Sequence, residues 1–171
     1  CTGQATWLAQ REWLGSKAAT SASFHLISGQ PKTRLHSQFD NGDYSKSHKR
    51  QGREPVLINP VDAERLGIEN GEVVCLHNER GQCLAAATVT DDVMPQVVFL
   101  WTGAWYDPDF EHPQHRDKHG NPNVLTHDLR TSDLAQGPAA HSTLVFVEKA
   151  KGDISEVSAF EPPAFVVDPF A

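Results

Sequence analysis

Apolar residues gather in short runs bounded by polar, Gly and Pro residues, a pattern typical of β-strands rather than of long helices. Two of these runs form a hairpin, because Gly81 ends the turn at residues 78–81 and Gly tolerates positive φ. Runs at this spacing predict a closed barrel, since closure removes the exposed edges of such apolar strands. The expected strands cover residues 24–27, 55–60, 73–78, 83–90, 97–101 and 142–150.

The sequence after the second run predicts one short helix. Asn59 is a good N-cap and Pro60 is favoured at the first helical position, while Gly67 stands where a left-handed C-cap belongs. Residues 60–67 therefore form about two turns, with Ala63 facing the core. No second helical crossover is evident, which argues against a parallel α/β sheet.

The remaining segments are polar or irregular. Residues 28–53 and 102–142 are long loops, and loops of this length inside a compact domain are usually functional or disordered. Residues 23–150 are expected to form the barrel domain. We expect residues 1–22 to be a linker from a preceding domain, since the chain does not open on a methionine. The acidic, Pro-rich residues 151–171 are expected to form a C-terminal tail that packs on something else.

Composition narrows the function classes. The chain has 171 residues and a formal net charge of −7, which argues against a general nucleic-acid binder, because such a protein needs a basic face. No apolar run approaches the ~20 residues of a membrane span, and the bulkiest is residues 97–101. The first residues lack the pattern of a signal peptide. A cytoplasmic location is expected, with a periplasmic one left open.

Three cysteines are present, Cys1, Cys75 and Cys83, and they form no CxxC pair. Cys75 and Cys83 lie on the two arms of the expected hairpin and could approach each other. Their odd number and ordinary strand settings favour reduced, structural thiols over a disulfide framework or a zinc site.

The polar loop at residues 28–38 is the most informative segment. It holds two cations, a histidine, three hydroxyl side chains and two amides, with no carboxylate before Asp40. Gly29 would let the backbone approach a ligand closely, and the Arg34 guanidinium could form a fork with phosphate oxygens. Composition alone favours a solvated surface loop.

Other polar residues have weaker claims. Asn123, Gln136 and Gly137 stand in Pro- and Gly-containing loops, where they could line a site or simply bond to local backbone. Trp105 and Tyr106 follow a buried strand and could wall a cavity or pack in the core.

Several charged and histidine side chains have simpler explanations. Arg80, in the hairpin turn, is expected to face solvent or a neighbouring domain, and Asp62 and Glu64 suit a helix N-terminus. A metal site is not expected from the following histidines, whose spacing fits no tight ligand set: His112, His115, His119, His127 and His141.

The segment "INPVDAERLGIENGEVVCLHNERGQ" resembles the strand–helix–turn–strand–RG signature of the double-psi β-barrel domain that ends molybdopterin-dependent oxidoreductases. The flanking segments "LISGQPKTRLHSQFDNG", "TGAWYDP", "GNPNVLT" and "LAQGPAAHS" are similar to the dimethyl sulfoxide reductase family. Within it, the biotin sulfoxide reductase branch is most similar, with trimethylamine N-oxide reductases close by. The resemblance spans roughly residues 24–149 in family order.

The resemblance implies a mainly β, six-stranded double-psi barrel that covers part of a bis(molybdopterin guanine dinucleotide) cofactor. The metal-ligating side chain and most substrate chemistry would belong to preceding domains of the same polypeptide, so the fragment alone is expected to lack the cofactor and to be inactive. Arg34→Ala should lower cofactor content with little loss of stability. The residues carried over to cofactor contact are Ser28, Gln30, Thr33, Arg34, His36, Ser37, Gln38, Asn123, Gln136 and Gly137, and Trp105 is added as a cavity wall.

Two other function classes stay open. A free-standing double-psi barrel could serve as a binding or adaptor module. A small barrel enzyme of the decarboxylase type would cleave itself at a Gly-Ser bond, and Gly15-Ser16 offers one, although it precedes the first strand.

Overall fold

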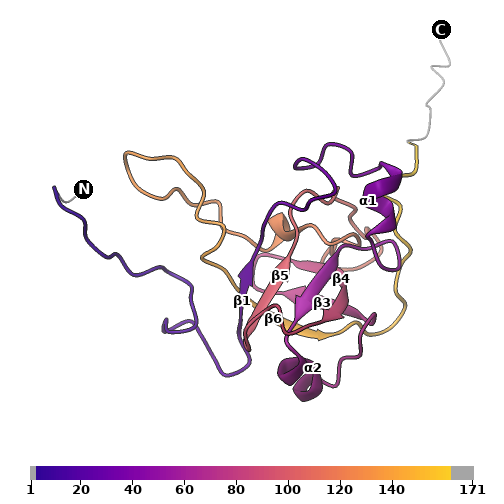
Figure 1. Ribbon diagram of the computed structural model, residues 1–171, viewed down its shortest axis with the longest axis horizontal. Helices are drawn as coiled ribbons and strands as arrows, with labels where there is room; N and C mark the ends of the chain where they lie inside the picture. Colours follow the sequence, from indigo (N-terminus) through magenta and orange to yellow (C-terminus); the bar gives the residue numbers. More distant parts are fainter. Residues whose placement is uncertain (1–2, 163–171) are drawn as a thin grey trace, which may run out of the picture.

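The computed structural model describes residues 3–162 and shows a six-stranded closed barrel with short helices at its two ends (Figure 1). The order around the barrel is β1-β5-β2-β4-β3-β6. The predicted six-stranded double-psi barrel is confirmed. The strands are β1 (Phe24–Ile27), β2 (Pro55–Ile58), β3 (Val73–His77), β4 (Gln82–Val89), β5 (Val97–Leu100) and β6 (Leu144–Lys149).

Strand pairing explains why distant loops meet. β1 runs parallel to β5, and β2 runs parallel to β4, while the other neighbours are antiparallel. Because β1 and β5 are parallel neighbours, the loops that follow them leave from the same end of the barrel. The long segments after residues 27 and 100 therefore start side by side.

The barrel interior holds the apolar core. Leu26, Val56, Leu76 and Val98 are fully buried there, so strands from all round the barrel contribute to one cluster. Burial of these side chains is the main stabilising term, at ~25 cal/mol per Å² of apolar surface removed from water.

The two hairpin cysteines are free thiols and lie on opposite faces of the sheet. Cys83 is opposite Leu76 and joins the barrel core, whereas Cys75 is opposite Leu84 and packs in a smaller cluster. Burial raises the pKa of Cys75 to about 11 and raises the pKa of Cys83 well above its usual value. Both are therefore unreactive structural thiols, as expected, and Cys1 lies outside the described residues.

The predicted helix is α2 (Pro60–Leu66) and has the expected caps. The Asn59 side chain accepts a hydrogen bond from the Val61 amide, and Gly67 adopts a left-handed conformation with φ of 66°. Two further short elements were not predicted, α1 (Asp43–Ser47) and the 3₁₀ turn η1 (Pro122–Val124). No helix within residues 3–162 is long and apolar enough to cross a membrane.

The lead-in residues extend away from the barrel but are anchored at one point (Figure 1). The Glu12 carboxylate receives hydrogen bonds from two Arg80 nitrogens, at 2.8 and 3.0 Å, and from the Leu144 amide at 2.8 Å. His127 Nε2 lies 2.7 Å from the same carboxylate. Arg80 thus faces this anchor rather than open solvent, and residues near Glu12 are tied to the barrel more closely than a plain linker would be.

The α2 cap provides a test of the local account. The Asn59 side chain also donates to the Val93 carbonyl at 2.7 Å, so Asn59→Ala removes a cap and a buried hydrogen bond. We expect the free energy of unfolding to fall by about 1–2 kcal/mol, measured by chemical denaturation. The exposed Asn41→Ala serves as the matched control and should cost less than about 0.5 kcal/mol. Equal stability of the two variants would contradict the cap assignment.

Candidate cofactor-binding site

A buried charge cluster lies beneath the polar loop. Arg34 Nε is 3.3 Å from Asp40 Oδ1, and Arg34 Nη2 is 3.1 Å from Glu54 Oε2. Lys49 Nζ lies 2.8 Å from Asp40 and 2.9 Å from Glu54. All four side chains are at most 4% exposed, so two cations and two carboxylates balance one another out of contact with water.

The cluster connects three parts of the chain. Asp40 follows the polar loop, Lys49 follows α1, and Glu54 immediately precedes β2. Arg34 Nη2 also donates to the Thr102 carbonyl at 2.6 Å, which joins the loop after β1 to the loop after β5. Burial alone would raise the pKa of Asp40, but the hydrogen bond and charge of Lys49, the Trp105 amide and the charge of Arg34 together hold that pKa below its usual value.

The position of Arg34 differs from the expected one. Its side chain is 1% exposed and its guanidinium nitrogens point at carboxylates and a carbonyl, so no nitrogen is presented on the surface for a phosphate fork. The buried position instead predicts that Arg34→Ala lowers stability, because removing one partner of a buried ion pair leaves uncompensated charge. Arg34 shapes the polar loop from beneath.

A second set of contacts fixes the outer part of the polar loop. Trp105 donates from its indole Nε1 to the Ser37 carbonyl at 2.7 Å and from its backbone N to Asp40 Oδ2 at 2.9 Å. Gly103 has φ of +88°, and a Cβ there would collide with the His36 carbonyl oxygen. Only glycine permits this close crossing of the two loops.

The crossing leaves a polar cavity of about 480 Å³ between the two loops. It brings together four of the predicted site residues, His36, Ser37, Trp105 and Asn123. The sequence interpretation missed further lining residues, which carry no signal of their own without the fold. These are Thr102, Gly103, Ala104 and Asn121. Tyr106, which the sequence suggested as a possible cavity wall, also lines the cavity.

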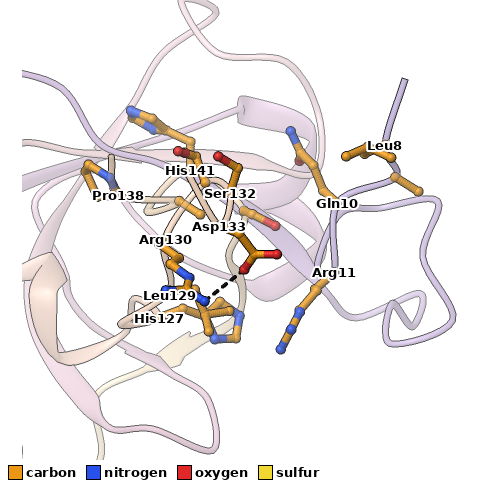
Figure 2. A pocket seen from close by; sticks show the side chains of 14 residues that line it. Leu8, Gln10, Arg11, His127, Leu129, Arg130, Ser132, Asp133, Pro138 and His141 are labelled. Atoms are coloured by element: carbon orange, nitrogen blue, oxygen red, sulfur yellow. Dashed lines mark hydrogen bonds and ion pairs between the residues drawn. The ribbon is translucent and has the colours of Figure 1, made fainter. Parts of the chain in front are cut away.

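A second cavity, of about 890 Å³, lies between the lead-in and residues 127–142 (Figure 2). Leu8 and Gln10 face it from one side, and Arg130 and His141 line the other, with Arg130 paired to Asp133 at 2.8 Å. A smaller neighbouring cavity of about 370 Å³ is lined by residues that include Gln136. Gly137 lies beside Thr131 and does not line either cavity.

The other predicted residues of the polar loop line none of these three cavities. The Ser28 amide donates to His141 Nδ1 at 3.4 Å, and the Ser28 hydroxyl is buried with no hydrogen-bond partner. Gln30 is exposed and donates from Nε2 to the Arg34 carbonyl at 2.6 Å. Thr33 is half-buried and Gln38 is exposed, and neither lines a cavity.

His119 is a buried structural residue, a role that the sequence did not single out. The His119 side chain is 0% exposed, and its Nδ1 lies 2.9 Å from the Trp105 carbonyl. Burial, followed by the nearby charge of Lys49, lowers the pKa of His119 to about 4, so the ring is neutral. Within residues 3–162, no three His, Cys, Asp or Glu side chains gather as a metal site requires.

A backbone turn built on Asp117 holds His119 in place. One oxygen of the Asp117 carboxylate accepts hydrogen bonds from the amides of His119, Gly120 and Asn121, at 3.1, 2.7 and 2.7 Å. Burial raises the pKa of Asp117 in spite of these donors. The turn places Asn121 and Asn123 at the cavity, because Asn121 is its last member and Asn123 follows two residues later.

Comparison with known proteins identifies the family of the chain. The family described as "Molydopterin dinucleotide binding domain" matches residues 24–144, and the chain belongs to this family. The chain is 45% identical, over 91% of its length, to biotin sulfoxide reductase of Cereibacter sphaeroides. It is 44% identical, over 98% of its length, to trimethylamine-N-oxide reductase 1 of Escherichia coli O157:H7. The predicted family resemblance is confirmed.

The chain spans 20% of the length of each of these curated relatives. A solved structure, acetylene hydratase from Pelobacter acetylenicus, superposes with a TM-score of 0.67 at 15% identity, covering 85% of this chain and 21% of that one. At that identity the likeness shows the fold alone.

The buried cluster leads to a stability prediction. Arg34→Ala should lower the free energy of unfolding by about 3–5 kcal/mol, because Asp40 and Glu54 would then share one cation. Lys32→Ala, an exposed cation in the same loop, is the control and should cost less than about 0.5 kcal/mol. Chemical denaturation measures both, and a loss below about 1 kcal/mol for Arg34→Ala would contradict a buried network.

His119 leads to a pH prediction. The unfolded ring takes up a proton near its ordinary pKa of 6.5, whereas the folded ring does so only at about 4. The unfolded state therefore binds more protons between these values, and stability falls by roughly 3 kcal/mol as the pH drops from 6.5 to 4.

The measurement is the slope of unfolding free energy against pH for wild type and for His119→Asn. The difference between the two slopes isolates the imidazole, because other titrating groups cancel. Parallel curves for wild type and His119→Asn would show that His119 is not buried in its neutral form.

Proposed function

We propose that the chain is the cofactor-binding domain at the C-terminal end of a molybdenum oxidoreductase that reduces S-oxides or N-oxides. Its cofactor would be bis(molybdopterin guanine dinucleotide). Family membership supports the dinucleotide, and the names of the two relatives support the class of substrate. The whole enzyme would add two protons and two electrons to the oxide, giving the sulfide or amine and water.

The polar residues present fit such a ligand. A pterin dinucleotide needs donors and acceptors for its ring edges and N–H groups or cations for its phosphates. The buried Ser28 hydroxyl lacks a partner, although buried polar groups are normally hydrogen-bonded. Next to it, a Cβ at Gly29 would lie 2.7 Å from Phe99, so the backbone here has no room for a side chain.

The observation that carries the proposal is the fixed crossing of the polar loop over the 102–106 loop. Two hydrogen bonds from Trp105 and the contact at Gly103 hold His36 and Ser37 at the cavity rim without using their side chains. These side chains and Asn123 stay exposed and free to bind. Preorganised polar groups of this kind bind a ligand without first having to be ordered.

We assign roles by position. His36, Ser37 and Asn123 would contact the cofactor at the smaller cavity, with Trp105 as its wall, and Ser28 and Gln136 would contact it on the side of residues 127–142. The assignment of contacts to Gln30, Thr33, Gln38 and Gly137 rests on the family motif. When bound, the cofactor would supply the redox-active molybdenum. The chain's own residues bind and orient it.

The proposal includes partners and location. Preceding domains of the same polypeptide would supply the metal ligand, most cofactor contacts and the substrate-selecting residues, so the isolated chain should bind the cofactor weakly and lack turnover. We propose a cytoplasmic location, with the periplasm as the alternative. No observation favours a free-standing adaptor or a self-cleaving decarboxylase.

The test uses the full-length protein. Purified wild type should contain molybdenum and release a pterin and guanosine monophosphate, and it should reduce S-oxides or N-oxides with a reduced dye. Asn123→Ala should lower the guanine nucleotide content per protein by about fivefold, because one good polar contact is worth about 1 kcal/mol. Asn41→Ala, an exposed amide outside both cavities, is the control. Wild-type protein free of pterin and nucleotide would contradict the proposal.

A further inference from the structure

The residues after β6 return across the barrel. Figure 1 shows this segment running from β6 toward the end of the barrel that carries α1. We call residues 153–160 the C-terminal strap. It lies beyond residues 24–144, the part of the chain that matches the family.

Two acid–base pairs anchor the strap. Lys118 Nζ is 3.3 Å from Asp107, and Ser158 joins this pair, since its backbone N and hydroxyl donate to Asp107 at 2.7 and 2.8 Å. Lys118 also donates to the Ser158 hydroxyl at 2.8 Å. Ser158 of the strap therefore supplies hydrogen bonds to a buried pair, Asp107 and Lys118.

The second anchor repeats this arrangement. Arg116 Nε is 3.4 Å from Asp109, and the Ser155 hydroxyl donates to the same carboxylate at 2.7 Å. Arg53 donates to the Ser155 carbonyl at 2.6 Å, and Arg116 donates to the Asp153 carbonyl at 3.0 Å. Two arginine side chains therefore hold the backbone of the strap.

The strap ends on an aromatic contact at the polar loop. The Phe160 ring packs edge-on against His119, with centroids 4.9 Å apart, and against Trp105 at 5.5 Å. Lys46 and Lys49 lie over its face, at 5.1 and 5.8 Å. Phe160 therefore touches the wall of the proposed cofactor cavity and one member of the buried charge cluster.

We propose that Phe160 is a positioning residue for the cofactor cavity and acts through Trp105. Trp105 must hold one orientation for its indole N–H to reach the Ser37 carbonyl, and that bond fixes the loop that presents His36. His119 packs against the same Phe160 ring, and its Nδ1 donates a hydrogen bond to the Trp105 carbonyl. Phe160 contacts both the Trp105 and the His119 rings, and the two anchors of the strap hold Phe160 in this position. The cofactor part of the inference rests on the proposed function.

The test uses the full-length protein and seven variants: Phe160→Ala, Phe160→Tyr and the control Phe146→Ala, each alone and combined with Trp105→Phe, and Trp105→Phe alone. Phe146, on β6, packs its ring against His77 on β3, with centroids 5.5 Å apart, and is not part of the contacts around Trp105. Two quantities are measured, the molybdopterin guanine dinucleotide content per protein and the emission of Trp105. The latter is the spectrum of each protein minus that of its Trp105→Phe counterpart.

We expect Phe160→Ala to shift the Trp105 emission to longer wavelength and to lower cofactor content by about threefold, the size of a modest coupling between contacting residues. Phe160→Tyr should restore both, because its ring keeps the edge contacts. In the Trp105→Phe background, Phe160→Ala should cause little further loss. Phe146→Ala should change neither quantity.

Three results would overturn the inference: unchanged emission and content in Phe160→Ala, an undiminished loss in the Trp105→Phe background, or an equal loss in Phe146→Ala. If Phe160→Ala does not fold, Ser158→Ala, which removes the hydroxyl's contacts with Asp107 and Lys118, must show the same direction of change. If the wild type contains no cofactor but Phe160→Ala still shifts the Trp105 emission, the proposed function is contradicted, while the contact through which Phe160 orients Trp105 is supported.

Discussion

The buried cluster of Arg34, Asp40, Lys49 and Glu54 is the constraint on which the site depends. Such a cluster is costly to desolvate, and its charges are tolerated only when all of them are paired. Pairing requires the polar loop, α1 and the start of β2 to lie together, so the cluster selects one arrangement of segments that have little apolar surface. The apolar core of the barrel stabilises the fold enough to offset the desolvation of these charges.

The barrel topology and the cluster act at the same end of the molecule. β1 and β5 are parallel neighbours, which places their following loops side by side, and Arg34 then joins these loops through the Thr102 carbonyl. Because backbone groups and buried side chains make these contacts, the exposed side chains of His36 and Asn123 are left for a ligand. Because the carboxylates are used in buried contacts and the exposed side chains are uncharged or histidine, an acidic chain can present a polar site with few carboxylates.

Local signals made much of the fold predictable. The caps of α2 lie within its own sequence, and the hairpin and apolar runs mark the strands, so short-range physics sufficed. Arg34 was misplaced because its burial depends on Asp40, Lys49 and Glu54, which composition cannot bring together. For the same reason, the sequence did not reveal that the described part of the tail packs on its own barrel through Ser158. Contacts between polar groups far apart in the sequence determine both the burial of Arg34 and the packing of the tail.

The most direct test of the central claim is hydrogen exchange at the Trp105 amide, which donates to the buried Asp40 carboxylate. If the cluster fixes the loops as a unit with the barrel, this amide exchanges only through global unfolding, as slowly as the Ala86 amide in β4, which bonds to the Glu54 carbonyl. Exchange of the Trp105 amide as fast as that of the exposed Ala135 amide would show that the loops open independently and would contradict the account.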